Sequence, residues 1–364
     1  MVKSVFQIGA VCAALLAGVL VLVFNAGSVR APAPGAESIL PKTTAAASST
    51  PAVPKTDAVA APGTDITGSI ASRDRLPAAG LVPAAAPSAR DASCSNPNAL
   101  GVSRVVEIDT TGGPGFGGEH FKGMDFLRPG EVVLTFDDGP WPNNTPKVLA
   151  ALARHCTKAI FFPIGLHATY EPDLVRQMAA AGHAVGSHTW CHQNLAKTKG
   201  RCLINGRTQT VEYNFKDEIE KGISAVSRAA GGPIAPFFRF PGLQQPPEAL
   251  AYLGTRNIAV FSTDLDSFDF KMRRPEQVRQ SVIAKLKKHG KGIILMHDFQ
   301  HVTADSIGQI LDDLKAGGYK VVQMRPRQEL KSLPEYDAIV MKGLKPVNVS
   351  GRPVESVVRT VGGN

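Results

Sequence analysis

From residue 131 onward, short apolar runs alternate with segments in which apolar residues recur at helical spacing. The apolar runs predict seven strands, at residues 132–136, 159–162, 183–187, 237–240, 258–262, 292–296 and 319–324. The segments between them predict helices, several of which carry a proline at the start or a glycine after the end, at Pro146, Pro172, Gly182, Pro275 and Gly317. Continuous apolar strands between amphipathic helices are typical of a parallel sheet that is covered on both faces.

This alternation predicts an α/β fold, with either an open doubly wound sheet or a barrel. No glycine-rich phosphate-binding sequence follows the first predicted strand, which favours a (β/α) barrel of about seven parallel strands over a nucleotide-binding fold. In both architectures, functional side chains gather at the carboxyl ends of the strands. The polar residues that follow each predicted strand are therefore the candidates for a site.

The chain before this pattern has a different composition. Residues 5–24 carry no charge and are mostly apolar, a length that is enough to cross a bilayer. We interpret residues 1–25 as a signal-anchor with its N-terminus in the cytoplasm, or as a cleaved signal peptide. Residues 26–93 are rich in Ala, Pro, Ser and Thr, which predicts a flexible linker. We expect a folded domain at residues 94–330 and a C-terminal tail, 331–364, made of an edge strand plus disorder.

Charge and cysteine content add two expectations. The formal net charge of +9 suits nucleic acid, anionic lipid or an acidic wall polymer, and predicted export argues against nucleic acid. The four cysteines outside the apolar segment permit three pairings. Their spacing favours Cys94 with Cys156 and Cys191 with Cys202, in an oxidising compartment. The sequence leaves the oligomeric state open, and a monomer is our working interpretation.

Two acidic residues follow the first predicted strand, in the sequence Thr-Phe-Asp-Asp-Gly-Pro at 135–140. Adjacent carboxylates repel each other, so an ordered pair needs a cation, an arginine or a shared proton nearby, although the same residues also form ordinary solvated turns. His188 and His192 follow the third strand and would face one cation if this segment turns helically. With Asp138 they would form a two-histidine, one-carboxylate set, which leaves positions open for water as in catalytic zinc sites.

Further polar residues follow other strands and are expected on the same rim, namely Arg239, Asp264, Asp266, Asp269, His297 and Asp298. Asp137, the neighbour of the predicted ligand Asp138, is the candidate base that accepts the proton of an attacking water. Arg239 would keep Asp137 ionised, because an adjacent cation lowers the pKa of a carboxyl. His297 would protonate the leaving group, with Asp269 fixing its tautomer.

These residues resemble the polysaccharide deacetylases of carbohydrate esterase family four, those with the nodulation-protein-B homology domain. The resemblance covers residues 131–325 and rests on five motifs in order: Thr-Phe-Asp-Asp-Gly-Pro at 135–140, Ser-His-Thr-x-x-His at 187–192, Arg-x-Pro at 239–241, Asp-x-x-Asp plus an aromatic residue at 266–270, and Ile-Leu-x-His-Asp at 294–298. It implies a distorted (β/α) barrel that hydrolyses N-acetyl or O-acetyl groups on polysaccharides with a divalent metal, commonly Zn²⁺. Residues 94–330 would then be the catalytic domain.

The resemblance also implies a role for each matched residue: Asp137 as base, Asp138, His188 and His192 as metal ligands, Arg239 as partner of the base, His297 as general acid and Asp269 as the residue that tunes it. Leu295 matches a position that lines the pocket for the acetyl methyl group, and the backbone N–H of Gly242 would help to hold the oxyanion. Three differences from the family pattern are expected to affect how the substrate fits. Gly242 stands where the family has an aromatic residue, Phe270 replaces a tryptophan, and residues 196–215 form a longer connection, expected as a loop beside the metal.

More than one function remains open at this point. The leading prediction is metal-dependent removal of N-acetyl groups from an N-acetylglucosamine-containing polysaccharide, either peptidoglycan or a chitin-like oligosaccharide. The alternatives are an O-acetyl esterase and a catalytically weak glycan-binding envelope protein. A phosphoesterase is disfavoured, because the sequence has neither a second metal-binding cluster nor a phosphate loop. The expected location is the inner membrane, facing the periplasm or cell wall, or outside the cell if the N-terminal segment is cleaved.

Overall fold

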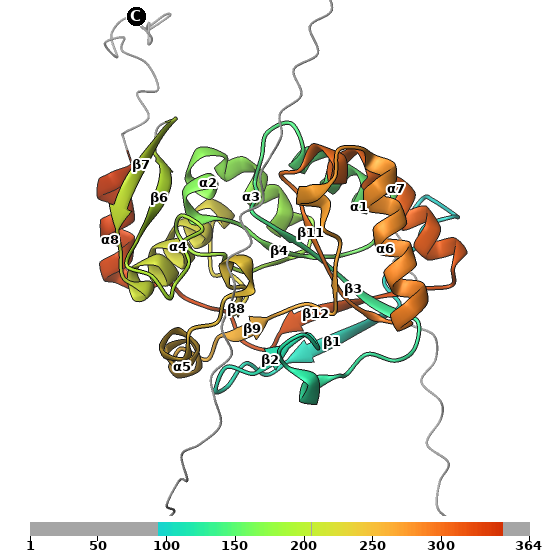
Figure 1. Ribbon diagram of the computed structural model, residues 1–364, viewed down its shortest axis with the longest axis horizontal. Coiled ribbons are helices and arrows are strands. Elements are labelled where there is room, and N and C mark those ends of the chain that lie inside the picture. The colour runs from blue at the N-terminus through green and yellow to red at the C-terminus, as the bar shows by residue number, and fades with distance from the viewer. Residues whose placement is uncertain (1–93, 205, 345–364) are drawn as a thin grey trace, which may run out of the picture. The chain divides into compact units, whose positions relative to one another are not determined.

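The computed structural model describes residues 94–204 and 206–344 (Figure 1). The predicted signal-anchor, the linker and the last 20 residues of the tail lie outside the described residues. Within the described part, no helix is both long enough and apolar enough to cross a membrane.

Strands and helices alternate along most of the described chain, as the sequence predicts. The strands are β1 (Arg104–Ile108), β2 (Gly115–Phe116), β3 (Glu131–Asp137), β4 (Ile160–Phe162), β5 (Ala184–Val185), β6 (Lys199–Ile204), β7 (Arg207–Glu212), β8 (Phe237–Phe238), β9 (Ala259–Phe261), β10 (Leu265–Asp266), β11 (Gly292–His297) and β12 (Lys320–Pro326). The α-helices are α1 (Thr145–Arg154), α2 (Gly165–Tyr170), α3 (Pro172–Ala180), α4 (Phe215–Ala230), α5 (Pro247–Thr255), α6 (Pro275–His289), α7 (His301–Ala316) and α8 (Pro334–Gly343). Short 3₁₀ turns lie at Lys122–Met124, Pro241–Leu243 and Asp269–Lys271.

The strand β3 is the centre of the main sheet. It pairs in parallel with β11 along one edge, and along the other edge with β12 at its start and with β4 at its end. The strands β10, β1 and β5 extend this sheet beyond β11, β12 and β4, again in parallel. A smaller parallel sheet has the order β2-β9-β8. The fold is therefore α/β with mostly parallel strands, and the predicted class is confirmed at that level.

A closed barrel is not confirmed by these pairings. The parallel strands divide between two sheets, and a single bridge between Ser187 and Phe238 joins the segments after β5 and in β8. Both sheets nevertheless contribute to one apolar cluster that includes Val133, Phe162 and Phe261. Side chains on the opposite face of β3 pack instead in a second cluster with residues of the helices. Burial on both faces explains why the sequence of β3 is mostly apolar without alternation.

The helices cover the main sheet in two groups that are visible in Figure 1. The helices α1, α6 and α7 pack together over one part of the sheet, and α2, α3, α4 and α8 pack together over another. The helix α8 corrects our prediction for the start of the tail, which we expected to be an edge strand. Its sequence gives a weak helix signal because Val340 is its only buried residue.

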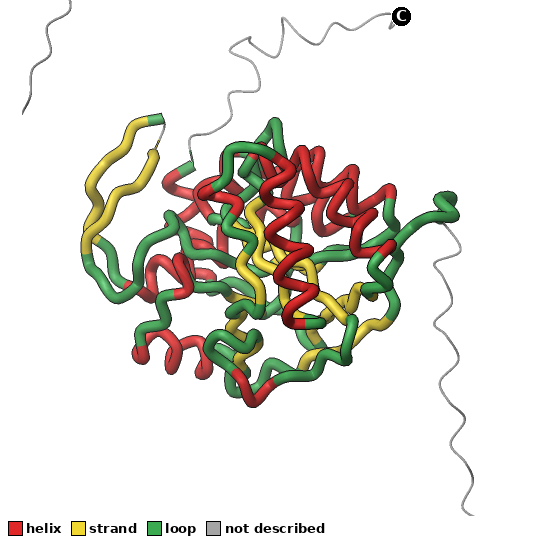
Figure 2. Tube along the Cα trace, turned by 45° about the vertical axis from the view of Figure 1, so that its right-hand side comes forward, coloured by secondary structure: helices red, strands yellow, loops and turns green. Residues whose placement is uncertain are grey.

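Both predicted disulfides are confirmed. Cys94 pairs with Cys156 and Cys191 pairs with Cys202, with Cα–Cα distances of 5.9 and 5.7 Å. The stretch 196–215, which we expected as a loop, contains the antiparallel hairpin of β6 and β7. Figure 2 shows this hairpin projecting from the body of the domain. The second disulfide joins β6 to the segment that carries His188 and His192.

Candidate active site

Three predicted ligands come together after two strands of the main sheet. Asp138 directly follows β3, and His188 and His192 follow β5. One oxygen or nitrogen atom from each residue lies within 4.8 Å of the corresponding atoms of the other two. Asp138 is half-buried and His188 is fully buried, whereas His192 is exposed, so the group opens to solvent on the His192 side. The arrangement has the composition of a metal site with room for water or substrate.

The two histidines converge without the helical turn that we gave as a condition for it. Residues 189–191 form an irregular turn, and both Thr189 and His192 have positive φ angles, of 68° and 53°. These angles are uncommon for residues other than glycine. The backbone N–H groups of Gly165 and Leu166 at the start of α2 donate to the carbonyls of Thr189 and Trp190, at 2.8 Å each. The turn is therefore fixed by contacts outside its own sequence.

The three ligand atoms fit a divalent cation. Oδ1 of Asp138 lies 3.3 Å from Nε2 of His188 and 3.3 Å from Nε2 of His192. Two atoms bound to a tetrahedral zinc ion at about 2.0–2.1 Å are themselves roughly 3.3 Å apart. Nδ1–H of His188 donates to the carbonyl of Arg239 at 2.7 Å, which leaves the lone pair of Nε2 directed at the carboxylate. Oδ1 of Asp138 is buried and accepts no hydrogen bond from the described residues. A cation between the three atoms would relieve the repulsion between this oxygen and the lone pairs of the two Nε2 atoms.

Beside these ligands, Asp137 forms an ion pair with Arg239. Asp137 is the last residue of β3, and its Oδ1 accepts from Nη1 of Arg239 at 2.8 Å. Arg239 is fully buried and also donates to the hydroxyl of Thr135 and to the carbonyls of Phe261 and Ser262. Its guanidinium lies 4.6 Å from the centre of the Phe162 ring. These hydrogen bonds hold the guanidinium in place beside one carboxylate, so the pair of Arg239 and Asp137 is buried and is not a surface ion pair.

His297 and Asp269 form a second buried pair on the other side of Asp138. Nδ1–H of His297 donates to Oδ1 of Asp269 at 2.7 Å, and the backbone N–H of His297 donates to Oδ2 at 2.7 Å. Nε2 of His297 faces Oδ2 of Asp138 at 3.9 Å. Burial alone would lower the pKa of His297, but the hydrogen bond and charge of Asp269, together with the charges of Asp138 and Asp137, raise it to about 10. These contacts favour the protonated form of His297, with Nε2–H facing the site.

Comparison with known proteins agrees with this geometry. The family model of polysaccharide deacetylases matches residues 127–259. A chitooligosaccharide deacetylase of Bradyrhizobium sp. is 31% identical over 167 residues, which cover 46% of this chain and 70% of that protein. The chain belongs to the polysaccharide deacetylase family.

Other members of the polysaccharide deacetylase family are similar over a comparable part of the chain. The peptidoglycan-N-acetylglucosamine deacetylase PgdA of Listeria monocytogenes is 34% identical over 194 residues, covering 52% of this chain but only 37% of that protein. The solved structure of the peptidoglycan deacetylase Bd3279 of Bdellovibrio bacteriovorus superposes with a TM-score of 0.52 at 28% identity, covering 62% of this chain and 59% of that one. The chain thus spans less than two thirds of the length of these two relatives.

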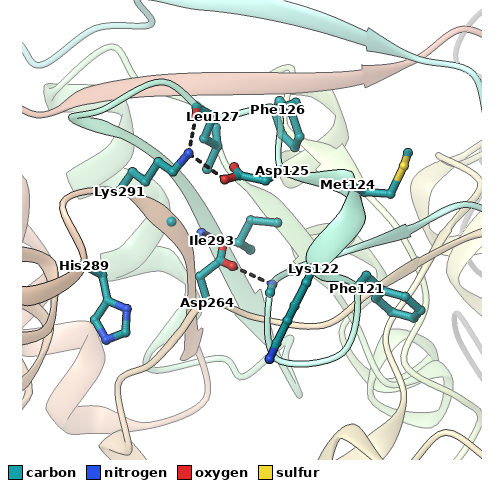
Figure 3. A pocket seen from close by; sticks show the side chains of 13 residues that line it. Phe121, Lys122, Met124, Asp125, Phe126, Leu127, Asp264, His289, Lys291 and Ile293 are labelled. Carbon is teal, nitrogen blue, oxygen red and sulfur yellow. Dashed lines mark hydrogen bonds and ion pairs between the residues drawn. The ribbon is translucent and has the colours of Figure 1, made fainter.

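One predicted rim residue of this family member lies elsewhere. Asp264 accepts from the backbone N–H groups of Gly118 and Ile293, and Ile293 is near the start of β11, at the opposite end from His297. Figure 3 shows Asp264 in a cavity of about 280 Å³, where Lys291 also pairs with Asp125. The prediction was wrong because the chain continues beyond Asp264 into β10, so this residue does not end a strand.

The structure places the two predicted substrate-binding positions, Leu295 and Gly242, but does not test their roles. Leu295 is buried in β11, two residues before His297, so both side chains lie on the same face of that strand. Gly242 is exposed in the 3₁₀ turn after Arg239, with a φ of 57°. A Cβ atom built at Gly242 meets only Gln244, at 4.0 Å, so the space where the family has an aromatic side chain is open.

Two further side chains, His167 and Asp298, support the segment at Asp138 and Gly139, and the sequence motifs give neither a role. Nδ1–H of His167 donates to the backbone carbonyl of Asp138 at 2.7 Å. Asp298 is fully buried, accepts a short hydrogen bond from the Thr145 hydroxyl and packs so closely on Gly139 that a Cβ atom there would come within 2.2 Å of its carboxylate. Burial raises the pKa of Asp298 to about 7. A signal for Asp298 was present, since it directly follows His297, whereas His167 lies outside every motif.

Proposed function

We propose that this protein removes N-acetyl groups from N-acetylglucosamine-containing polysaccharide in a metal-dependent reaction that releases acetate. The observation that supports it best is the combination around Asp138 of three ligand atoms, an aspartate fixed by arginine and a histidine paired with a buried carboxylate. A binding protein would not need Asp137 and His297 in these environments. The names of the relatives, which are peptidoglycan and chitin or chitooligosaccharide deacetylases, support the same substrate class.

The proposed reaction follows from what each side chain can do. Asp138, His188 and His192 would hold the cation, proposed to be Zn²⁺, which when bound would supply a Lewis acid for the acetyl carbonyl and for water. Asp137, held in place by Arg239, accepts a proton from the attacking water. His297 gives its proton to the amine nitrogen as the bond between carbon and nitrogen breaks. Acetate and a free amino sugar are the products.

Exposed aromatic side chains near His297 support a sugar substrate. The Phe270 ring lies 5.6 Å from the His297 ring in an edge-on arrangement and is 48% exposed. Trp141 is 38% exposed and contacts Phe299, whose ring lies 6.1 Å from the His297 ring. Exposed rings of this kind offer apolar faces to the C–H groups of a sugar. In this proposal, Leu295 lines the acetyl pocket and the N–H of Gly242 faces the oxyanion, as the family resemblance implies.

The proposal includes export, with the N-terminal segment as a membrane tether or signal peptide. The two disulfides support an oxidising compartment, because such bonds are rare in reducing cytosol. A cell-envelope location would bring the domain to its glycan. The tether itself stays a prediction, since it lies outside the described residues.

Acetate release decides between the proposed function and its alternatives. The purified protein with zinc is expected to release acetate from an N-acetylglucosamine oligomer or from peptidoglycan, with free amino sugars detected by mass spectrometry. Release from acetylated xylan alone would identify an O-acetyl esterase instead. Binding of the glycans without any release would indicate a glycan-binding protein.

The pH dependence of kcat tests the proposed pair of His297 and Asp269. Asp269→Asn removes the charge that helps to raise the pKa of His297, so the loss of activity on the basic side should begin at lower pH than in the unchanged protein. Asp266→Asn is the matched control, because this carboxylate interacts with His297 through its charge without a hydrogen bond to it among the described residues, and should move that limb much less. If kcat falls at the same basic pH in the Asp269 variant and in the unchanged protein, His297 is not the general acid that we propose.

A further inference from the structure

The turn between the two predicted histidine ligands needs support from outside, because its own backbone is strained. Thr189 and His192 both have positive φ angles, which cost free energy for residues with a side chain. Backbone N–H groups at the start of α2 donate hydrogen bonds to the carbonyls of Thr189 and Trp190. The N–H groups of the same turn must also be satisfied, since Cys191 is buried and Trp190 is half-buried.

Both of those N–H groups donate to one residue, Glu218 in the first turn of α4. The N–H of Trp190 donates to the backbone carbonyl of Glu218 at 2.7 Å, and the N–H of Cys191 donates to its Oε2 at 2.9 Å. The helix α4 also approaches the turn closely at Gly222, where a Cβ atom would lie 2.6 Å from the carbonyl carbon of Thr189. Glu218 therefore contacts the residue directly before His192.

Glu218 is an unusual group to find in a core. Its side chain is 3% exposed, and among the described residues no cation lies within ion-pair distance of it. Burial raises the pKa of its carboxyl to about 7. A buried carboxylate without an ion-pair partner lowers stability, so a purely structural role would be served as well by a neutral side chain.

We propose that Glu218 is a positioning residue for the metal centre: it fixes the turn at Trp190 and Cys191 and thereby directs Nε2 of His192 toward Asp138. This inference rests on the proposed function, because it assumes that His192 binds the metal. Glu218 touches neither substrate nor metal. It acts through two hydrogen bonds from backbone N–H groups of the turn, which set the orientation of His192, the exposed ligand.

The same helix offers a matched control. Glu220 is also fully buried, but it accepts from Nε of Arg256 at 2.8 Å and from the hydroxyl of Tyr252 at 2.7 Å, and its carboxylate has no hydrogen bond to the described residues of the turn. Replacement of either glutamate by alanine removes a buried carboxylate from α4. Only the change at Glu218 frees the N–H of Cys191.

Zinc affinity, measured without substrate by competition with a chromogenic chelator, separates the two variants. Glu218→Ala is expected to weaken zinc binding by about 10–100-fold, the range found when residues that orient metal ligands are removed. Glu218→Gln keeps an acceptor oxygen and should recover part of that loss. Glu220→Ala should lower the thermal stability but leave zinc affinity unchanged. The visible spectrum of the Co²⁺-loaded protein should change in the Glu218 variants only.

Two results would overturn the inference. One is a Glu218→Ala protein that binds zinc as tightly as the unchanged chain, and the other is an equal loss of affinity in Glu220→Ala. If the alanine variant does not fold, Glu218→Gln and Glu220→Gln replace the pair, with weaker zinc binding expected only in the first. Failure of the unchanged protein to bind zinc would refute the proposed metal centre itself, and this outcome is distinct from both of the others.

Discussion

Asp137→Asn is expected to lower kcat by about 10²–10⁴-fold while zinc remains bound, the range for loss of a general base. Asparagine has the shape of aspartate, and its oxygen can still accept from Nη1 of Arg239, which now reaches Oδ1 of Asp137 at 2.8 Å. An amide cannot take a proton from water at neutral pH. The measurements are kcat on an N-acetylglucosamine oligomer and zinc content of the purified variant.

The neighbouring residue provides the control for Asp137. Asp138→Asn replaces a proposed metal ligand, so it should lose zinc as well as activity, in contrast to Asp137→Asn. Thermal unfolding of both variants checks the fold, because the buried Arg239 loses its ionic partner when Asp137 becomes neutral. Activity of Asp137→Asn within tenfold of the unchanged protein would assign the base to another group.

Removal of the metal is expected to abolish acetate release, and addition of zinc should restore it. The same treatment should change stability, because Asp138 and the two histidines then face one another without a cation. A ligand that binds only the folded protein at 100 times its dissociation constant stabilises it by about 2.7 kcal/mol, which raises the melting temperature. Calorimetric scans of chelated and zinc-loaded protein measure this difference.

The control for metal removal is a variant that lacks one ligand. His188→Ala should melt at the same temperature with and without zinc, since it has lost the buried member of the ligand set. Chelated protein that still releases acetate at the original rate would show that the reaction does not depend on the metal.

The sequence predicted the site better than its surroundings for a physical reason. Asp137, Arg239 and His297 each follow or end a strand, and the ends of parallel strands meet at one edge whatever the loops do. Buried strands are recognisable because both faces must be apolar, as in β3. Asp264 is an exception, because it lies between β9 and β10, which belong to different sheets, and its carboxylate accepts from Ile293 near the start of β11.

The parts that sequence reasoning missed depend on contacts between distant segments. The turn that carries His192 takes its shape from α2 and α4, not from a local helical preference. Glu218 has no signal beyond an acidic residue in the first turn of a helix, which is common. The hairpin of β6 and β7 does have a local signal, since the sequence Asn-Gly at 205–206 is typical of a two-residue hairpin turn.

The disulfide between Cys191 and Cys202 encloses His192 in a short covalent ring. Its two cysteines are 11 positions apart, and the rest of the hairpin, including its tip, lies outside the ring. Loss of strand pairing at the tip of the hairpin therefore cannot carry His192 away from Asp138. Insertions near residues 204–207 would leave the ring intact, so the hairpin offers a place where chain length and composition can vary independently of metal geometry.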